Sequence, residues 1–405
     1  MNVSYFISQR LRHKGAHNFS AVIEKIAVGS IALGLASMII SFLIFKGFKG
    51  EIQEKVFSFG AHIKAEKFDL NNSFEQSPIS TNSYLFQHYD EIEGINHIQS
   101  FSQKPALIKV ENEVASAVFK GVSLGYDSLR FKKYLLEGRF IDFSAKKYAK
   151  EIIISKQISN KLQIEVNDEV ILFFVQDPPR IRKLKVVGIY QTWIEEFDNL
   201  LVIGDERLVR RLNNWDDTLS GGFEIFVDDF DQLNPTFERV YNKMDYDFSI
   251  DKVTDSFAGL FDWFIMLNRN VYVFLLIILT VASFNIVAIM LIIIMERTNM
   301  IGSLKALGAS NKQIQQIFIF TGYRLIVKGL LIGNAIGIGF GFVQQKWKVI
   351  PLEAQNYFMD SVPISFDWLI ILGLNILFIL LIAAVLFFPT LLISRIEPVK
   401  SIKFN

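Results

Sequence analysis

Cysteine is absent from this 405-residue chain, and neither sign of charge is in clear excess. Without cysteine there is no disulfide, no thiolate metal ligand and no cysteine nucleophile. The 42 Lys and Arg residues almost balance the 41 Asp and Glu residues, which gives a formal net charge of +1 at pH 7. Because no basic stretch is long or clustered enough to follow a phosphate backbone, the sequence gives no indication of nucleic-acid binding.

Short catalytic motifs are also scarce. The sequence holds no HExxH, no GxxxxGK[ST] loop and no dense cluster of carboxylates with histidines. One G-x-S-x-G string, the pattern of the nucleophile elbow in α/β-hydrolases, occurs at 121–125. Those hydrolases place the histidine after the serine, whereas all five histidines here precede Ser123. We therefore expect no catalytic, cofactor-binding or metal-binding residue in this chain.

Long apolar runs are abundant instead. Hydrophobic residues make up 51% of the chain while 20% are charged, so membrane and soluble parts must coexist. Four segments are predicted to cross a bilayer: 26–45, 271–295, 329–343 and 368–393. The first run has 20 uncharged residues and no small-x-small cleavage site after it, so we expect an uncleaved anchor rather than a signal peptide.

The charges beside these runs predict the orientation. Segments 1–25, 296–313 and 394–405 hold ten Lys and Arg residues, whereas 46–60, 256–270 and 344–367 hold six, which puts both termini inside. The predicted order is a cytoplasmic interfacial helix (1–25), a first transmembrane helix (26–45), an extracytoplasmic domain with helical stalks (46–270), a core of three transmembrane helices (271–393) and a cytoplasmic tail (394–405).

The segment between the first two spans alternates β-rich runs with helical patterns. The β-rich runs lie at 151–154, 170–175, 185–190, 200–203 and 223–227, and the helical ones near 157–162, 206–213 and 235–244. The predicted fold class is therefore an α-helical membrane protein with four transmembrane helices plus a large extracytoplasmic α+β domain between the first and second helix.

Apolar stripes lead from the membrane into both ends of this domain. They consist of Ile44, Phe48, Ile52 and Val56 after the first span, and of Phe257, Leu260, Phe261, Phe264 and Leu267 before the second. An exposed apolar stripe of that extent usually marks a binding surface. The alternative is that both helices bury their stripes against the soluble domain.

The last three spans contain small and polar residues. Each holds one asparagine, Asn285, Asn334 or Asn375, which is costly in lipid unless it is paired. Hydrogen bonding between helices and a role in substrate passage are both open. The third span also carries two overlapping GxxxG steps at 333, 337 and 341, typical of close helix contact.

A short amphipathic helix is predicted at 297–308, directly after the second span. Its apolar side consists of Met300, Ile301, Leu304 and Leu307. Gly308 fits a helix C′ position, and Ser310 with Gln313 forms a capping-box pattern for the next helix. A helix of about ten residues is marginal alone in water, so a partner must hold it. The alternative is a re-entrant turn that packs on its own membrane helices.

The string ERTNMIGSLKALGAS at 296–310 resembles the E-R-x-x-x-I-G-x-L-K-A-L-G-A motif of FtsX-type permeases of the ABC superfamily. In that family the segment is the coupling helix that docks on a separate ATPase, which binds ATP and magnesium. The resemblance assigns ATPase coupling to Glu296, Arg297, Met300, Ile301, Leu304, Lys305, Leu307 and Gly308.

Within that family the chain most resembles the lipoprotein-releasing permeases of the LolC/LolE type. The strings that carry the resemblance are FGAHI at 59–63, GRF at 138–140, EIIISKQISNKL at 151–162, KVVGI at 185–189 and SRIEP at 394–398. The resemblance implies a bacterial inner-membrane protein with a periplasmic domain. Two protomers, identical or homologous, would sit over two LolD-like ATPase subunits, extract acylated lipoproteins and pass them to a LolA-like carrier.

Two further sites follow from this resemblance. The stalk stripes are predicted to line a lipid cleft with Phe48, Ile52, Val56, Phe257, Phe261 and Phe264. LolC-like permeases have a long arm that hooks the carrier, but here only about ten residues around Pro178 and Pro179 join two strands. A contact with the carrier at these prolines and a plain hairpin loop are both open.

Two alternative functions belong to the same superfamily. An FtsX-like subunit would transmit ATP-driven motion to a cell-wall hydrolase without transporting anything. A MacB-like efflux protein normally has a fused ATPase, which this chain lacks. The large α+β domain favours the lipoprotein hypothesis, because division FtsX proteins have a smaller one.

Overall fold

The computed structural model describes residues 19–69, 75–110 and 113–391. They form two compact units. The first holds the chain up to Gly50, Trp263–Leu352 and the chain from Ser361, and the second holds Glu51–Asp262 and Glu353–Asp360. Most of the predicted interfacial helix 1–25 and the whole tail 394–405 lie outside the described residues.

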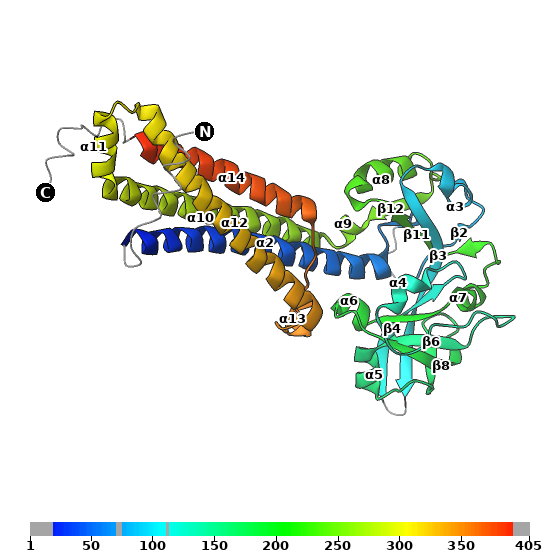
Figure 1. Cartoon of the computed structure of the whole chain (residues 1–405). Helices are drawn as coiled ribbons and strands as arrows, with labels where there is room; N and C mark the ends of the chain where they lie inside the picture. Colours follow the sequence, from blue (N-terminus) through cyan, green and yellow to red (C-terminus); the bar gives the residue numbers. More distant parts are fainter. Residues whose placement is uncertain (1–18, 70–74, 111–112, 392–405) are drawn as a thin grey trace. The chain divides into compact units, whose positions relative to one another are not determined.

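Four helices of the described chain are long and apolar enough to cross a membrane, as predicted. They are α2 (Phe19–Gly60), α10 (Ala258–Glu296), α12 (Asn311–Trp347) and α14 (Trp368–Leu391), and they are labelled in Figure 1. α2 and α10 contain 42 and 39 residues, so each is about 60 Å long, roughly twice the thickness of a hydrocarbon core. Both helices therefore continue well beyond their apolar runs. A nine-residue helix, α11 (Thr298–Ala306), connects α10 to α12.

In the membrane unit, α12 packs against α2 along a row of glycines. A Cβ atom on Gly333 would lie 2.8 Å from the carbonyl oxygen of Ala32, and one on Gly329 would lie 2.3 Å from Cγ2 of Ile31. There is no room for a side chain, so the two backbones approach as closely as the GxxxG steps predicted. The row consists of Gly329, Gly333, Gly337 and Gly341, which face Ile31, Ala32, Leu35, Ala36, Ile39 and Leu43 of α2.

Two of the three intramembrane asparagines pair with each other. The Asn334 amide on α12 donates to Asn375 Oδ1 on α14 at 2.7 Å, and the Asn375 amide donates back at 3.0 Å. Each amide also donates to the carbonyl four residues earlier in its own helix. Hydrogen bonding between helices is therefore confirmed for this pair. Asn285 on α10 is exposed instead.

The second unit is built on a ten-stranded mixed sheet with the order β12-β1-β11-β3-β4-β9-β6-β8-β5, in which β7 pairs with β3 and β8. Most neighbours are antiparallel, but β4–β9 and β6–β8 are parallel. The strands are β1 (Ile63–Lys67), β3 (Ile95–Val110), β4 (Glu113–Val122), β5 (Leu135–Gly138), β6 (Glu151–Ser155), β7 (Glu169–Phe174), β8 (Arg180–Tyr190), β9 (Leu201–Asp205), β11 (Gly222–Val227) and β12 (Phe248–Lys252). A separate small sheet pairs β2 (Ile79–Ser80) with β10 (Leu219–Ser220).

Short helices complete this unit. They are α3 (Tyr84–Gln87), α4 (Ser128–Lys132), α5 (Lys156–Leu162), α6 (Glu195–Asp198), α7 (Glu206–Asn213), α8 (Leu233–Tyr241), α9 (Val253–Ser256) and α13 (Ala354–Tyr357). An apolar core lies between the sheet and α5 and α7, and includes Phe119, Ile152, Leu172 and Leu208. The mixture of strands and helices between the first and second span confirms the predicted fold class.

The end of α2 is anchored inside the second unit. The buried ring of Phe59 lies 5.2 to 5.5 Å from the rings of Phe131, Tyr134, Tyr190 and Phe197. Its main-chain carbonyl accepts a 2.8 Å hydrogen bond from the buried Lys120 amine. Residues 353–360 also belong to this unit, where the Lys55 amine donates to the carbonyl of Phe358.

Candidate functional site

The two sequence signals that follow the predicted coupling helix are both present, a glycine that ends α11 and a capping box that begins α12. α11 ends at Ala306, and Gly308 adopts a φ of +90°, which favours glycine because it lacks a Cβ atom. The Ala309 amide then donates to the Leu304 carbonyl at 2.9 Å. Ser310 begins α12 with a complete capping box, in which the Ser310 hydroxyl and the Gln313 side chain each accept from the other residue's backbone amide.

The apolar side of α11 faces mainly its own helix bundle. Ile301 is fully buried in the core of the membrane unit, and Met300 and Leu304 pack against that core with part of their surface exposed. Leu307 points outward and is 85% exposed. The contact with the bundle that the re-entrant alternative required is therefore present, and only Leu307 remains as a large exposed apolar side chain among the predicted coupling residues.

The predicted coupling residues at the two ends of α11 are charged or small. Glu296 and Gly308 are exposed, while Arg297 and Lys305 are half-buried. The exposed surface around Leu307 continues through Ser303, Ala306, Ser310, Asn311 and Lys312. One apolar anchor surrounded by small and polar groups is the composition expected of a protein-binding surface.

The stalk stripes are largely covered in the structure. Ile52 and Val56 are fully buried and Phe264 is buried, whereas Phe48, Phe257 and Phe261 are half-buried. The premise that these stripes are exposed is therefore wrong for Ile52, Val56 and Phe264. Aromatic rings of the second unit cover part of these stripes. The ring of Phe257 lies 5.7 Å from that of Phe197, and the ring of Phe261 lies 5.8 Å from that of Phe230. A lipid cleft along these residues stays a prediction, and it requires the buried side chains of the stripes to become exposed.

The loop with Pro178 and Pro179 is a compact hairpin tip. Only five residues, 175–179, separate β7 from β8, and both prolines are exposed. Arg180, at the start of β8, donates to the carbonyl of Arg211 and to the side-chain oxygen of Asn214, which ties the tip to the end of α7. The loop is shorter than the ten residues expected, and a contact with a carrier at its prolines is not tested by the structure.

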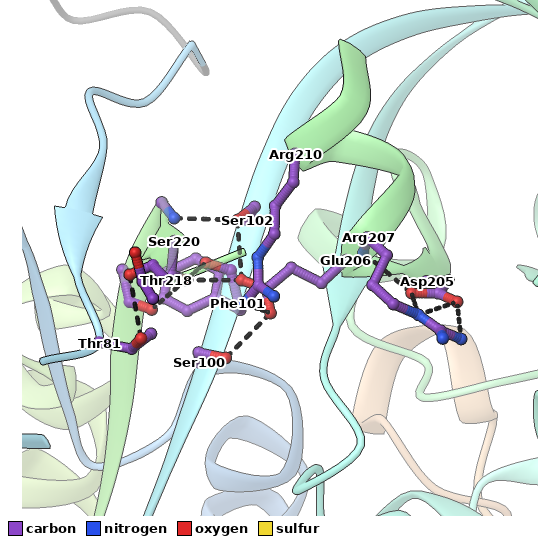
Figure 2. A network of polar contacts seen from close by, with 12 residues as sticks. Thr81, Ser100, Phe101, Ser102, Asp205, Glu206, Arg207, Arg210, Thr218 and Ser220 are labelled. Carbon is purple, nitrogen blue, oxygen red and sulfur yellow. Dashed lines mark hydrogen bonds and ion pairs between the residues drawn. The ribbon is translucent and has the colours of Figure 1, made fainter. Parts of the chain in front are cut away.

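A buried polar network that the sequence did not indicate lies where β3 meets α7. Figure 2 shows three serine hydroxyls converging on the Glu206 carboxylate, from Ser100 and Ser102 at 2.9 Å and from Ser220 at 2.6 Å. Arg210, one turn further along α7, completes the set with an ion pair of 2.8 Å. Burial raises the pKa of Glu206, while Arg210 and the serines oppose that shift. The network joins β3, β10 and α7 through hydrogen bonds, and we assign it a structural role.

Catalytic geometry is not found at the G-x-S-x-G string. β4 ends at Val122, and Ser123 lies in a turn closed by the Tyr126 amide rather than at the start of a helix. The neighbouring His97 ring contacts the carbonyl of Gly125 at 3.1 Å. Among the described residues no group of His, Cys, Asp and Glu could hold a metal ion. A groove of about 490 Å³ runs past Ser123, Leu124 and Arg210, but most of its charged groups are already paired with one another.

Comparison with protein families defines the class of this protein. Residues 26–234, about half of the chain, match the MacB-like periplasmic core domain, and residues 272–398 match the FtsX-like permease C-terminal region. The chain therefore belongs to the family of FtsX-like ABC transporter permeases that carry a MacB-like periplasmic core domain. It is an inner-membrane transport subunit rather than an enzyme, and its α/β domain is periplasmic.

The individual proteins that this chain resembles include permeases of lipoprotein-releasing systems. The chain is 24% identical to the lipoprotein-releasing system transmembrane protein LolC of Buchnera aphidicola, over 90% of this chain and 89% of the relative. It is also 24% identical to the LolE protein of Haemophilus influenzae, over 98% of both chains. Among solved structures, the periplasmic region of MacB from Actinobacillus actinomycetemcomitans is 13% identical, with a TM-score of 0.34, and the match covers 49% of this chain and 92% of that one.

Proposed function

We propose that this chain is the permease subunit of an ABC transporter that extracts lipoproteins from the inner membrane for transfer toward the outer membrane. The observation that carries the transporter assignment is α11, a short helix between two membrane spans that is followed by Gly308 and leaves Leu307 exposed as an anchor. The kind of cargo rests on the lipoprotein-releasing relatives, which align with nearly the full length of the chain.

The energy source lies in a partner. Each buried CH₂ of an acyl chain contributes about 0.8 kcal/mol to membrane anchoring, so lifting a lipoprotein with several chains out of the bilayer is uphill. We assign ATP and magnesium binding to a separate LolD-like ATPase that docks on the surface around Leu307. A second permease protomer completes the transporter, and a LolA-like periplasmic carrier receives the lipoprotein.

Depletion of the protein tests the cargo. Newly made lipoproteins that carry outer-membrane signals should accumulate in the inner-membrane fraction within one doubling, because extraction is the step that fails. An outer-membrane β-barrel protein without acyl chains is the control and should still reach the outer membrane. Normal lipoprotein distribution in depleted cells would exclude the proposed cargo.

A second candidate function is supported by the anchoring of α2. Phe59 and Lys120 attach the end of this long helix firmly to the sheet of the periplasmic domain. A buried attachment of this kind at the end of α2 suits mechanical transmission to a cell-wall hydrolase as well as it suits transport. The same depletion separates the two, since a defect in daughter-cell separation with normal lipoprotein sorting supports the FtsX-like role.

A further inference from the structure

Three cations lie near the inner end of the membrane unit, on two neighbouring helices. Arg324 and Lys328 are one turn apart on α12, so their side chains leave the same face with Cβ atoms about 6 Å apart. Lys25 lies on α2, three residues before Val28, whose carbonyl oxygen would lie 3.3 Å from a Cβ atom on Gly329. Lys25 is therefore about one turn further inward on the side of α2 that faces α12, level with Arg324.

The neighbouring helix α14 shows how deep these cations lie. The domain between α2 and α10 is periplasmic, so α2 begins on the cytoplasmic side. A Cβ atom on Gly322 would lie 2.8 Å from Cδ1 of Leu386, so Arg324 is about 3 Å closer to the bilayer centre than Leu386. The uncharged run of α14 continues from 387 to 393, about 10 Å toward the cytoplasm. Long cationic side chains that start at this depth extend along the helix to the headgroup phosphates of the cytoplasmic leaflet.

These cations have no counter-ion in the described part of the chain. Lys25 is exposed, and Arg324 and Lys328 are half-buried. Within the described ranges none of the three forms an ion pair or a side-chain hydrogen bond. At the outer end of the same bundle, by contrast, Lys46 of α2 is paired with Asp367. The difference indicates that the inner cations meet an anion from elsewhere.

Acidic residues are scarce at this level of the membrane unit. Residues 285–295 of α10 and 378–391 of α14 contain no Asp or Glu. Glu24 of α2 is half-buried, and it forms no ion pair with another described residue. One carboxylate against three cations leaves an excess of two positive charges. An excess of charge at membrane depth is costly, and an external anion removes that cost.

Apolar surface continues from the cations toward the centre of the bilayer. Leu331 and Ile332 lie three and four residues after Lys328, on the same face of α12, and they are 68% and 46% exposed. A ligand at this place meets positive charge at the headgroup level and a lipid-like surface below it. An anionic phospholipid has both parts. The guanidinium of Arg324 matches two phosphate oxygens, while the lysines supply charge.

We propose that Lys25, Arg324 and Lys328 bind the phosphate of an anionic phospholipid from the cytoplasmic leaflet, whose acyl chains lie along Leu331 and Ile332. A zwitterionic phospholipid carries an ammonium group that the three cations repel, so the site selects by headgroup charge. The site is separate from the surface around Leu307, and the inference does not rest on the proposed cargo.

Lipid binding by the purified full chain tests this site. The protein in detergent is titrated with phosphatidylglycerol and, separately, with phosphatidylethanolamine that carries the same acyl chains, and the bound lipid is counted by native mass spectrometry. The parent should prefer phosphatidylglycerol. Each cation near an anionic lipid contributes about 5-fold to binding, so Arg324→Gln combined with Lys328→Gln should weaken phosphatidylglycerol binding about 30-fold. Phosphatidylethanolamine binding should stay unchanged.

Two further double variants serve as controls. Lys346→Gln with Lys348→Gln removes two exposed cations from the outer end of the same helix and should leave the preference unchanged. Arg324→Lys with Lys328→Arg keeps both charges and should keep most of the preference, which separates loss of charge from loss of folding. A parent that binds both lipids equally, or a double glutamine variant that keeps the preference, would overturn the proposal.

Two other outcomes identify a different occupant. Displacement of phosphatidylglycerol by an equal concentration of inorganic phosphate means that the site takes a free phosphate group, and it overturns the lipid assignment. Glu397 is the alternative counter-ion, because it is the only acidic side chain in segments 1–18 and 392–405, outside the described residues. A preference for phosphatidylglycerol that appears only in Glu397→Gln means that this carboxylate neutralises the cations, and the proposal is then wrong.

Discussion

The amine of Lys120 on β4 donates a hydrogen bond to the main-chain carbonyl of Phe59, in the last turn of α2, and forms a buried ion pair with Glu224 on β11. One side chain thereby satisfies an orphan carbonyl at a helix end and neutralises a buried carboxylate. Both partners are almost completely buried, so neither group can turn to water if the other is removed.

Removal of this amine should destabilise the periplasmic domain. Lys120→Met keeps much of the side-chain volume but leaves the Glu224 charge unpaired in the interior, which costs about 3–5 kcal/mol. We expect a lower midpoint of thermal unfolding for the purified full chain in detergent, followed by tryptophan fluorescence. The double variant Lys120→Met, Glu224→Gln should recover part of the loss, because the unpaired charge is gone. A double variant less stable than Lys120→Met would contradict this account.

Docking of the ATPase should depend on Leu307 more selectively than on Leu304. Leu307→Asp places a charge on a side chain that is 85% exposed, so the free permease should fold and insert normally. In the complex the same charge would be buried without a partner, and co-purification of the ATPase should fall at least about 10-fold. Leu304→Asp should also disturb the bundle, because Leu304 packs on its core.

The exposed Leu124 offers a matched control for this experiment. It lies in the periplasmic domain and is 81% exposed, so Leu124→Asp makes the same chemical change on an equally exposed side chain. ATPase binding should be unchanged in this variant. Retention of the ATPase by Leu307→Asp would refute the docking surface around α11.

The orientation in the membrane can be checked with the same cysteine-free chain. Ser116 on β4 and Ser303 on α11 are both exposed, and they are assigned to opposite sides of the membrane. A thiol reagent that cannot cross the inner membrane should label Ser116→Cys in cells with a permeabilised outer membrane, and should label Ser303→Cys only after lysis. The reverse pattern would invalidate the topology.

Acid should weaken the periplasmic domain through His62. Burial, with a smaller contribution from Arg130, lowers the pKa of His62 from 6.5 to about 4. Its Nδ1 atom accepts from the Val227 amide at 2.8 Å, which requires that nitrogen to be unprotonated. The folded state binds the proton less readily than the unfolded state, so stability is complete above pH 6.5 and declines as the pH falls toward 4. The loss amounts to about 3 kcal/mol.

His62→Gln tests the assignment, because a glutamine oxygen can accept from the same amide but does not titrate. Unfolding in urea between pH 7 and pH 4, measured on the full chain in detergent, should show a shallower pH dependence for the variant than for the parent. Identical dependence in both proteins would mean that other groups cause the acid sensitivity.

The sequence predicted those features that depend on local chemistry. Gly308 and the Ser310–Gln313 capping box fix the ends of two helices within a few residues, and both are present in the structure. The glycine row and the Asn334–Asn375 pair were also indicated, because small and polar residues are rare enough in a span to demand an explanation.

The central β3–β4 hairpin was missed for a physical reason. β3 carries Gln99, Ser100, Ser102 and Lys104, all buried, so its sequence does not alternate between apolar and polar residues as a half-buried strand should. Their partners, which include Glu206, Glu224 and Asn213, come from more than 100 positions further along the chain. The burial of the stalk stripes could not be predicted either, since Phe197 and Phe230, which contact them, belong to parts of the domain that are distant in sequence.

The glycine row between α2 and α12 determines where the membrane unit can move. The glycines contribute no side chain to this contact, and they face Ala32, Ala36 and branched side chains of α2, so few rotamers can be exchanged and the two helices form one rigid pair. Contacts of α10 and α14 are made by longer side chains such as Ile278 and Phe378, which can repack. Any sliding or tilting of helices in the membrane unit should therefore occur where α10 or α14 contacts the α2–α12 pair, and not between α2 and α12.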